Sequence, residues 1–169
     1  MRGSSATMFL DRLLAANERY AAGHPLANLD APPSERLAIV TCMDARIDPL
    51  PLLGLRPGQA HVLRNAGARV TDDVLRSLVI SQQALGTDVV IVMPHTSCGL
   101  LGLDPATLHP RRAAGRPATR LDFHPMSDLE AALRQDIQSL RESPWIGENA
   151  EIHGLILDTA TGYIVRPDL

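Results

Sequence analysis

The sequence lacks several features that would point to particular classes of protein. It has no lysine, since all sixteen basic residues are arginine, and it has only five aromatic residues (two Phe, two Tyr and one Trp). A net charge of −3 with so few rings argues against binding of single-stranded nucleic acid, which needs a basic groove and stacking faces. No apolar run approaches the roughly 20 residues that span a membrane. We therefore expect neither a nucleic-acid partner nor a membrane partner.

Cysteine is also scarce. The chain has two cysteines and no apolar signal-peptide core, because Asp11 and Arg12 follow a short apolar stretch directly. Two cysteines without a secretory context favour reduced thiols over a disulfide. With 169 residues the chain is long enough to bury a core without disulfides, and it shows no internal repeat. We predict a single domain over residues 1–169, located in the cytoplasm.

The hydrophobic pattern predicts an α/β fold. Four short apolar runs are typical of buried parallel strands: 37–41, 60–64, 88–93 and 152–157. Three segments have helical periodicity: 8–22, 72–85 and one that opens at the capping-box pattern 127–130. A turn at 158–162 leads into 163–165, which we expect to be an antiparallel edge strand. The predicted architecture is a four-stranded parallel sheet with flanking helices and this antiparallel C-terminal edge. Residues 99–126, rich in Pro and Arg, are expected to form a functional flap or a disordered loop.

Chemically reactive side chains follow two of the predicted strands. Cys42 comes directly after the first strand, and His95 and Cys98 follow the strand at 88–93. In open α/β sheets the working crevice lies beyond the carboxyl ends of the strands, so these residues are expected on one rim. Two thiolates and an imidazole form a zinc-binding set with a fourth position left open. The alternatives are that each residue is an ordinary core side chain, or that the cysteines form a disulfide.

Asp44 and Arg46 follow Cys42 at alternate positions and allow two arrangements. If Asp44 supplies a fourth metal ligand, the site is closed and has no place for water. If Arg46 instead holds Asp44 in a two-pronged ion pair, water takes the open position and Asp44 can accept its proton. Without a catalytic part, the pair would be a rim salt bridge worth about 0–1 kcal/mol. We favour the catalytic pair held by Arg46.

Three motifs resemble those of the β-class carbonic anhydrases: Cys42-Met43-Asp44-Ala45-Arg46, Arg64-Asn65-Ala66-Gly67 and His95-Thr96-Ser97-Cys98-Gly99. The stretch 71–78 is similar to the short bacterial branch of that family, and the resemblance covers nearly all of the chain after the N-terminal helix. It implies an enzyme with one zinc per chain that interconverts carbon dioxide and bicarbonate through a zinc-bound hydroxide. The implied metal ligands are Cys42, His95 and Cys98, with the Asp44–Arg46 pair as the catalytic residues and Gly67 bringing backbone close to the site.

The resemblance has further implications for assembly and for Asp44. It implies a homodimer or a larger oligomer in which the helix at 8–22 packs on a partner subunit. It also implies that Asp44 can swing onto the zinc and become a fourth ligand, usually at lower pH. Two other functions remain open: a carbonyl sulfide hydrolase that uses the same zinc site, and a catalytically silent zinc- or bicarbonate-binding module in which Asp44 always ligates.

Overall fold

A computed structural model describes residues 3–24, 26, 28–108 and 121–168 of the chain. These residues belong to two units, 1–30 and 31–169. The first unit consists of helix α1 (Gly3–Ala22) and the turn that follows it. The helix expected over 8–22 is therefore confirmed, and it begins five residues earlier, at Gly3. All the strands lie in the second unit.

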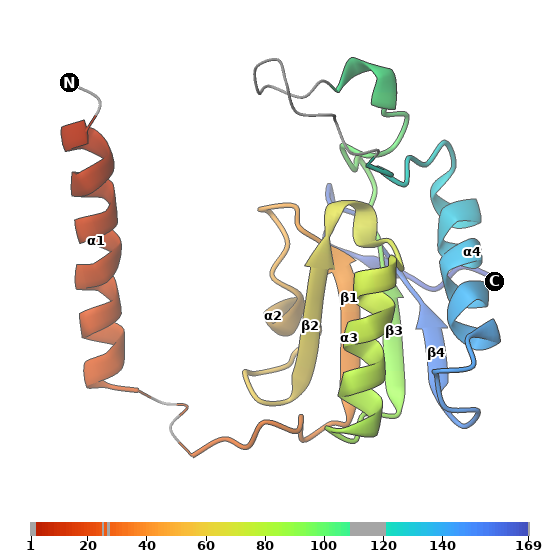
Figure 1. Ribbon diagram of the computed structural model, residues 1–169, viewed down its shortest axis with the longest axis horizontal. Coiled ribbons are helices and arrows are strands. Elements are labelled where there is room, and N and C mark those ends of the chain that lie inside the picture. The colour runs from red at the N-terminus through yellow and green to blue at the C-terminus, as the bar shows by residue number, and fades with distance from the viewer. Residues whose placement is uncertain (1–2, 25, 27, 109–120, 169) are drawn as a thin grey trace. The chain divides into compact units, whose positions relative to one another are not determined.

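A parallel sheet forms the centre of the second unit, as Figure 1 shows. Its strand order is β2-β1-β3-β4, and every neighbouring pair is parallel. The bounds are β1 (Leu37–Cys42), β2 (Ala60–Asn65), β3 (Val89–Met93) and β4 (Glu151–Gly154). Since β1 lies between β2 and β3, all six of its residues are buried. This burial explains why its sequence is apolar without alternation.

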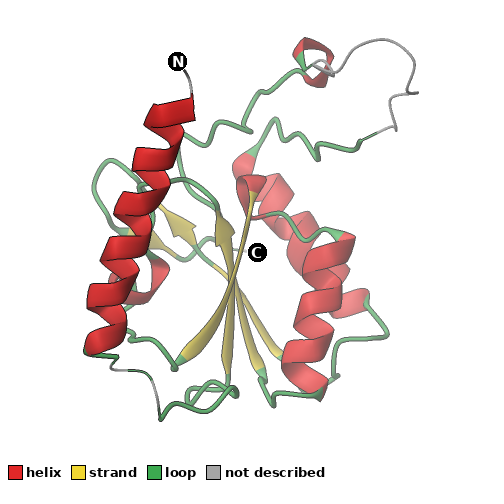
Figure 2. Cartoon of the chain, turned by 60° about the vertical axis from the view of Figure 1, so that its left-hand side comes forward, coloured by secondary structure: helices red, strands yellow, loops and turns green. Residues whose placement is uncertain are grey.

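Helices α3 (Asp72–Gln83) and α4 (Leu129–Glu142) lie on the same side of the sheet (Figure 2). Side chains alternate between the two faces of a strand, and the core on this side therefore takes every second residue of β1 and β3. Its buried members are Ala38, Val40, Val74, Leu78, Val90, Val92, Leu133, Ile137, Leu140, Ile146, Ile152 and Ile156. Burying a leucine of this kind contributes about 1.5–3 kcal/mol. The short helix α2 (Pro49–Leu52) follows β1.

The stretch 152–157, expected to be one strand, is divided between two sheets. The chain leaves the ladder with β3 after Gly154, and β5 (Ile156–Leu157) pairs with β6 (Ile164–Val165) in a separate antiparallel sheet. The turn at 158–162 folds the chain back and is closed by the bond from the Asp158 amide to the Tyr163 carbonyl, 2.9 Å. The four-stranded parallel sheet and the antiparallel C-terminal pairing are thus confirmed, with the pairing set apart from the main sheet.

The helix starts follow local side-chain chemistry. Thr71 caps α3 as expected, since its hydroxyl accepts a hydrogen bond from the Val74 amide. In α4 the cap is Asp128, which accepts from the Ala131 amide at 2.6 Å, so the capping-box pattern predicted the position of this helix start to within one residue. The loop 99–126 contains a short 3-10 turn, η2 (Pro105–Thr107), and its residues 109–120 lie outside the described part. Among the described helices, none has the length and apolarity needed to cross a membrane.

Candidate metal centre

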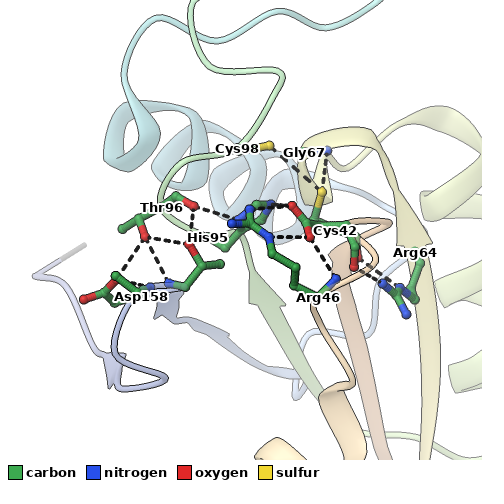
Figure 3. Close-up of polar contacts among 11 residues, drawn as sticks. Cys42, Arg46, Arg64, Gly67, His95, Thr96, Cys98 and Asp158 are labelled. Carbon is green, nitrogen blue, oxygen red and sulfur yellow. Dashed lines mark hydrogen bonds and ion pairs between the residues drawn. The ribbon is translucent and has the colours of Figure 1, made fainter.

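The three predicted metal ligands come together at the carboxyl ends of β1 and β3. Cys42 is the last residue of β1, and His95 and Cys98 lie in the turn after β3, which pairs directly with β1. One ligand atom from each lies within 4.8 Å of the other two, and all three residues are buried. Figure 3 shows Cys42, His95 and Cys98 converging from the two strand ends. Adjacent parallel strands bring together residues that are more than fifty positions apart in the sequence.

The geometry of this cluster fits one tetrahedral ion. The two sulfur atoms are 4.0 Å apart and both thiols are free, so the disulfide considered above is not formed between these described residues. Sulfurs bound at about 2.3 Å to a tetrahedral ion would lie about 3.8 Å from each other. The observed spacing therefore suits two thiolate ligands of a single metal.

His95 supplies the second observation in favour of a metal. Its side chain is completely buried, and its Nε2 atom has no hydrogen-bond partner among the described residues. Asp44 Oδ2 lies 3.8 Å from Nε2, which is too far for a hydrogen bond. A buried polar atom without a partner costs about 1–3 kcal/mol. A metal ion between Nε2 and the two sulfurs would satisfy this nitrogen.

The surroundings of the Cys98 thiol shift its pKa. Burial raises the pKa of the Cys98 thiol, and the adjacent Cys42 raises it further, whereas the backbone N–H of Leu100 lowers it. Two thiolates side by side in a buried site are mutually repulsive, so a bound cation would favour their ionised form. The Gly67 amide donates to Cys42 Sγ at 3.4 Å, which confirms that this glycine brings backbone to the site. Gly67 has a φ of +78°, a conformation that glycine adopts without strain.

Asp44 is held by Arg46 in the arrangement that we favoured. Arg46 Nε donates to Asp44 Oδ1 at 2.9 Å and Nη2 donates to Oδ2 at 2.8 Å, while the Arg46 amide also donates to Oδ1 at 3.0 Å. These hydrogen bonds hold the pKa of the Asp44 carboxyl well below its usual range. Asp44 is therefore an ionised hydrogen-bond acceptor at the edge of the cluster, and its carboxylate is bonded to Arg46.

Arg64 has a structural role that sequence reasoning did not assign. Its Nε donates to the Cys42 carbonyl at 3.0 Å, and its Nη2 donates to the Asp44 carbonyl at 2.7 Å (Figure 3). Arg64 lies on β2 opposite Thr41 of β1, so it reaches the backbone just beyond the end of β1. The only signal for it in the sequence was its presence in the Arg64–Gly67 motif.

A pocket of about 510 Å³ opens beside the cluster. Its walls are mostly apolar or backbone, and they are formed by Cys42, Met43, Asp44, Ala45, Ala66, Gly67, Cys98, Gly99, Leu100 and Leu103. Among the described residues, Asp44 is the only charged one in this lining. A small uncharged molecule could therefore reach the cluster without displacing a charged side chain of the described part.

Three of the other histidines, His24, His61 and His153, contact neighbouring residues away from the cluster. His61 bonds Ser81 Oγ at 2.7 Å and the Ala31 carbonyl at 3.2 Å. His153 lies 3.4 Å from Glu151 on β4. His24 stacks at a tilt on Tyr20, and His109 lies outside the described residues.

Comparison with known proteins gives a consistent result. Residues 37–116 match the profile of a family described as "Carbonic anhydrase". The chain is 41% identical over 154 residues to Beta-carbonic anhydrase 1 of Mycobacterium tuberculosis, covering 90% of this chain and 93% of that protein. It is also 32% identical over 163 residues to a carbon disulfide hydrolase of an Acidianus species, covering 81% of this chain and 79% of that enzyme.

Solved structures agree with the sequence comparisons. A crystal structure of carbonic anhydrase from Streptococcus mutans superposes with a TM-score of 0.84 at 44% sequence identity, covering 95% of this chain and 98% of that one. A carbonic anhydrase from Glaciozyma antarctica superposes with a TM-score of 0.80 at 39% identity, covering 90% and 94% of the two chains. Both superpositions extend well beyond the residues of the metal centre.

Proposed function

Since this chain belongs to the β-class carbonic anhydrase family, we propose that it catalyses the reversible hydration of carbon dioxide to bicarbonate with one zinc ion per chain. One observation carries the proposal. The buried, unpartnered Nε2 of His95 lies with two free thiols in a cluster that can hold a single ion, and an Arg46-bound carboxylate is next to it. Nε2 has no hydrogen-bond partner among the residues that the structure describes.

Cys42, His95 and Cys98 would hold the zinc through two sulfurs and Nε2. When bound, zinc lowers the pKa of a coordinated water to about 7 and so supplies a nucleophile at neutral pH. The two thiolates balance the charge of the ion, and His95 contributes as a neutral imidazole. The hydrogen bond from the Gly67 amide shares the negative charge of the Cys42 sulfur.

Asp44 orients the attacking water by accepting a hydrogen bond from it. Arg46 keeps the carboxylate ionised and occupies it with three hydrogen bonds, which prevents Asp44 from turning into the cluster as a fourth ligand. Arg64 fixes the backbone carbonyl of Asp44 and thereby the position from which its side chain starts. Carbon dioxide would enter along the apolar wall that includes Leu100 and Leu103.

Metal analysis combined with a stopped-flow hydration assay tests this function. The zinc-loaded chain should contain one zinc and should hydrate carbon dioxide at pH values around and above about 7. His95→Gln should lose zinc and activity together, whereas His153→Gln, which changes a histidine on β4 paired with Glu151, should keep both. A zinc-replete chain that stays inert at alkaline pH would instead identify a silent binding module.

Hydrolysis of a carbon–sulfur double bond is the second candidate. The similarity to the Acidianus carbon disulfide hydrolase favours it, and the apolar pocket suits carbonyl sulfide or carbon disulfide as well as carbon dioxide. Sulfide release and bicarbonate formation should be measured on the same zinc-loaded preparation. Sulfide release with no measurable hydration of carbon dioxide would replace the main proposal.

We further propose that the chain is a homodimer, or a larger assembly, in which α1 packs on a partner subunit. Within its unit, α1 exposes a set of large apolar side chains, each at least 47% accessible: Met8, Phe9, Leu10, Leu13, Leu14 and Tyr20. Most of the stability of a helix in a protein comes from packing of its apolar face, so α1 needs a surface to cover these side chains. Light scattering should give a dimer or larger for the native chain and a smaller species for Phe9→Ser/Leu13→Ser, while Glu18→Ser on the same helix should behave as the native chain does. An unchanged mass in the double variant would contradict this role.

The cytoplasm is the compartment that best suits this chemistry. Cys42 and Cys98 must stay reduced to hold zinc, and cytoplasmic conditions keep thiols reduced. Fractionation of cells that produce the chain should recover it with cytoplasmic markers. Recovery in a periplasmic or secreted fraction would contradict the assignment.

A further inference from the structure

The C-terminal turn at 158–162 packs against the loop that carries His95. The Thr96 amide donates to the Leu157 carbonyl at 2.9 Å, and the Leu157 amide donates to the Pro94 carbonyl at 3.0 Å. These bonds form an isolated parallel bridge between His95 and Leu157. Residues about sixty positions after the metal-ligand turn are therefore held directly beside it.

The Thr96 carbonyl links this turn to the imidazole. It accepts a hydrogen bond from His95 Nδ1 at 2.8 Å and a second from Thr159 Oγ1 at 3.1 Å. A carbonyl oxygen can only accept, so Nδ1 carries a proton, and in the neutral imidazole the lone pair is then on Nε2. Nε2 is the nitrogen without a partner among the described residues. The hydrogen bond at one ring nitrogen thus decides which nitrogen is available for a metal.

Thr159 and Thr96 are joined by two hydrogen bonds. The Thr159 amide donates to Thr96 Oγ1 at 3.1 Å, and the Thr159 hydroxyl donates to the Thr96 carbonyl. Thr96 Oγ1 in turn donates to Asp158 Oδ1 at 3.2 Å (Figure 3). The hydroxyl and the carbonyl of Thr96 both have hydrogen-bond partners in this turn, so the peptide group after Thr96 has little freedom to rotate.

The next residue makes this support necessary. Ser97 has a φ of +54°, which is a strained conformation for a residue other than glycine. Relaxation of Ser97 towards a negative φ would turn the Thr96 carbonyl and weaken its bond to Nδ1. The strained turn is also what returns the chain from His95 to Cys98.

We propose that Thr159 is a positioning residue for His95, whose hydroxyl holds the Thr96 carbonyl against Nδ1 and so presents Nε2 to the zinc. This inference rests on the proposed function, because it assigns Thr159 to the same zinc site. Thr159 does not touch the metal or the substrate in this role. Outer partners of metal-bound histidines typically contribute 10–100-fold to metal affinity or activity.

Zinc affinity measured by chelator competition tests the proposal on the full-length chain. Thr159→Val has nearly the same shape and lacks the hydroxyl, and it should bind zinc about 10–100-fold more weakly. Thr159→Ser restores a hydroxyl and should return the affinity close to that of the native chain. Thr107→Val is the matched control, because Thr107 also donates its hydroxyl to a backbone carbonyl, that of Asp104, but in η2. The control should bind zinc as the native chain does.

Proton exchange at His95 Nδ1–H separates positioning from general stability. In the zinc-loaded chain, the NMR signal of this proton should exchange faster with water in Thr159→Val, while the urea unfolding midpoint stays close to the native value. If Thr159→Val does not fold, Thr96→Val, which removes the Oγ1 side of the arrangement, should weaken zinc binding in the same direction. Native zinc affinity together with native exchange in a folded Thr159→Val or Thr96→Val would overturn the proposal.

The hydration rate of the native chain separates this proposal from the proposed function. An inert native chain with weaker zinc binding in Thr159→Val would keep the role of Thr159 and reject the activity. An active native chain with unchanged zinc binding in Thr159→Val would reject the role and keep the activity.

Discussion

Gly67 packs directly against Leu100 in the wall of the pocket. A Cβ atom placed on Gly67 would lie 2.5 Å from Leu100 Cδ2, closer than real side chains approach one another, and Gly67 also has a positive φ. The same residue donates its amide to the Cys42 sulfur. Backbone at position 67 can therefore reach the metal centre only if the residue has no side chain.

We expect Gly67→Ala to damage the metal centre. The added methyl group must displace Leu100 or the Gly67 backbone, and overpacking of this kind costs about 1–3 kcal/mol of unfolding free energy. Urea unfolding and zinc content measure the two effects. Gly147→Ala is the control, because a Cβ there would meet nothing within 4 Å. Adding Leu100→Ala to Gly67→Ala should recover part of the stability, and a lack of any recovery would show that the contact with Leu100 is not the cause.

We expect Arg46→Ala to lower the hydration rate of the zinc-loaded chain by about 10–100-fold while zinc stays bound. Without the Arg46 side chain, the Asp44 carboxylate loses two of its three hydrogen bonds, keeping only the one from the backbone amide of residue 46, and it can then turn onto the metal as a fourth ligand. Arg46→Lys should be impaired as well, because an ammonium group cannot reproduce the two parallel bonds. Arg76→Ala, which breaks the exposed pair with Asp73, is the control and should leave the rate unchanged. A native hydration rate in Arg46→Ala would show that the Asp44–Arg46 pair is not needed for catalysis.

A buried ion pair joins the turn after β2 to α4, and we expect its disruption to lower the stability of the fold. Arg69 Nε donates to Asp136 Oδ2 at 2.7 Å, and both side chains are less than 10% exposed. Asp136→Ala leaves a buried guanidinium without its counter-ion, which should cost about 3–5 kcal/mol in urea unfolding. Arg69→Met/Asp136→Leu removes both charges and should be closer to the native stability. A loss below about 1 kcal/mol in Asp136→Ala would show that water reaches this pair.

At the start of α4, the two adjacent residues Ser127 and Asp128 should differ in how much they contribute to stability. Asp128 accepts the Ala131 amide and caps the helix, so Asp128→Ala should lower the unfolding free energy by about 1 kcal/mol. Ser127, the first residue of the capping-box pattern, is exposed and lies outside the helix, so Ser127→Ala should change stability by less than about 0.5 kcal/mol. Chemical denaturation of the two variants side by side checks the assignment. The reverse order of effects would place the cap at Ser127.

Local pattern was enough to predict most elements and the cluster of Cys42, His95 and Cys98. The strands at 37–41, 60–64 and 88–93 and the helix starting after Thr71 follow from apolar runs and caps, which act over a few residues. His95 and Cys98 were recognisable because their spacing places both in one turn, and Cys42 because it ends another strand. Such features depend on neighbours in the chain, so they can be deduced from the sequence.

The sequence left other features undecided. The run 152–157 was interpreted as one strand because most of its residues are apolar, but the chain leaves the ladder with β3 after Gly154 and then pairs with β6. Asp44 had two possible partners, the metal or Arg46, and in the structure its carboxylate is bonded to Arg46. In each case the competing arrangements differ in long-range contacts and have the same local sequence.

By itself, then, the sequence determined the α/β architecture and the chemistry of the donor set, because periodicity and residue type act locally. The tertiary structure alone decided the support around those donors. Arg64 meets the backbone of residues 42 and 44 only because β2 pairs with β1 in one particular register. Thr159 meets Thr96 only because the C-terminal turn folds back beside the end of β3. Hydrogen bonds between residues 20 to 63 positions apart depend on strand order and register, which no local pattern specifies.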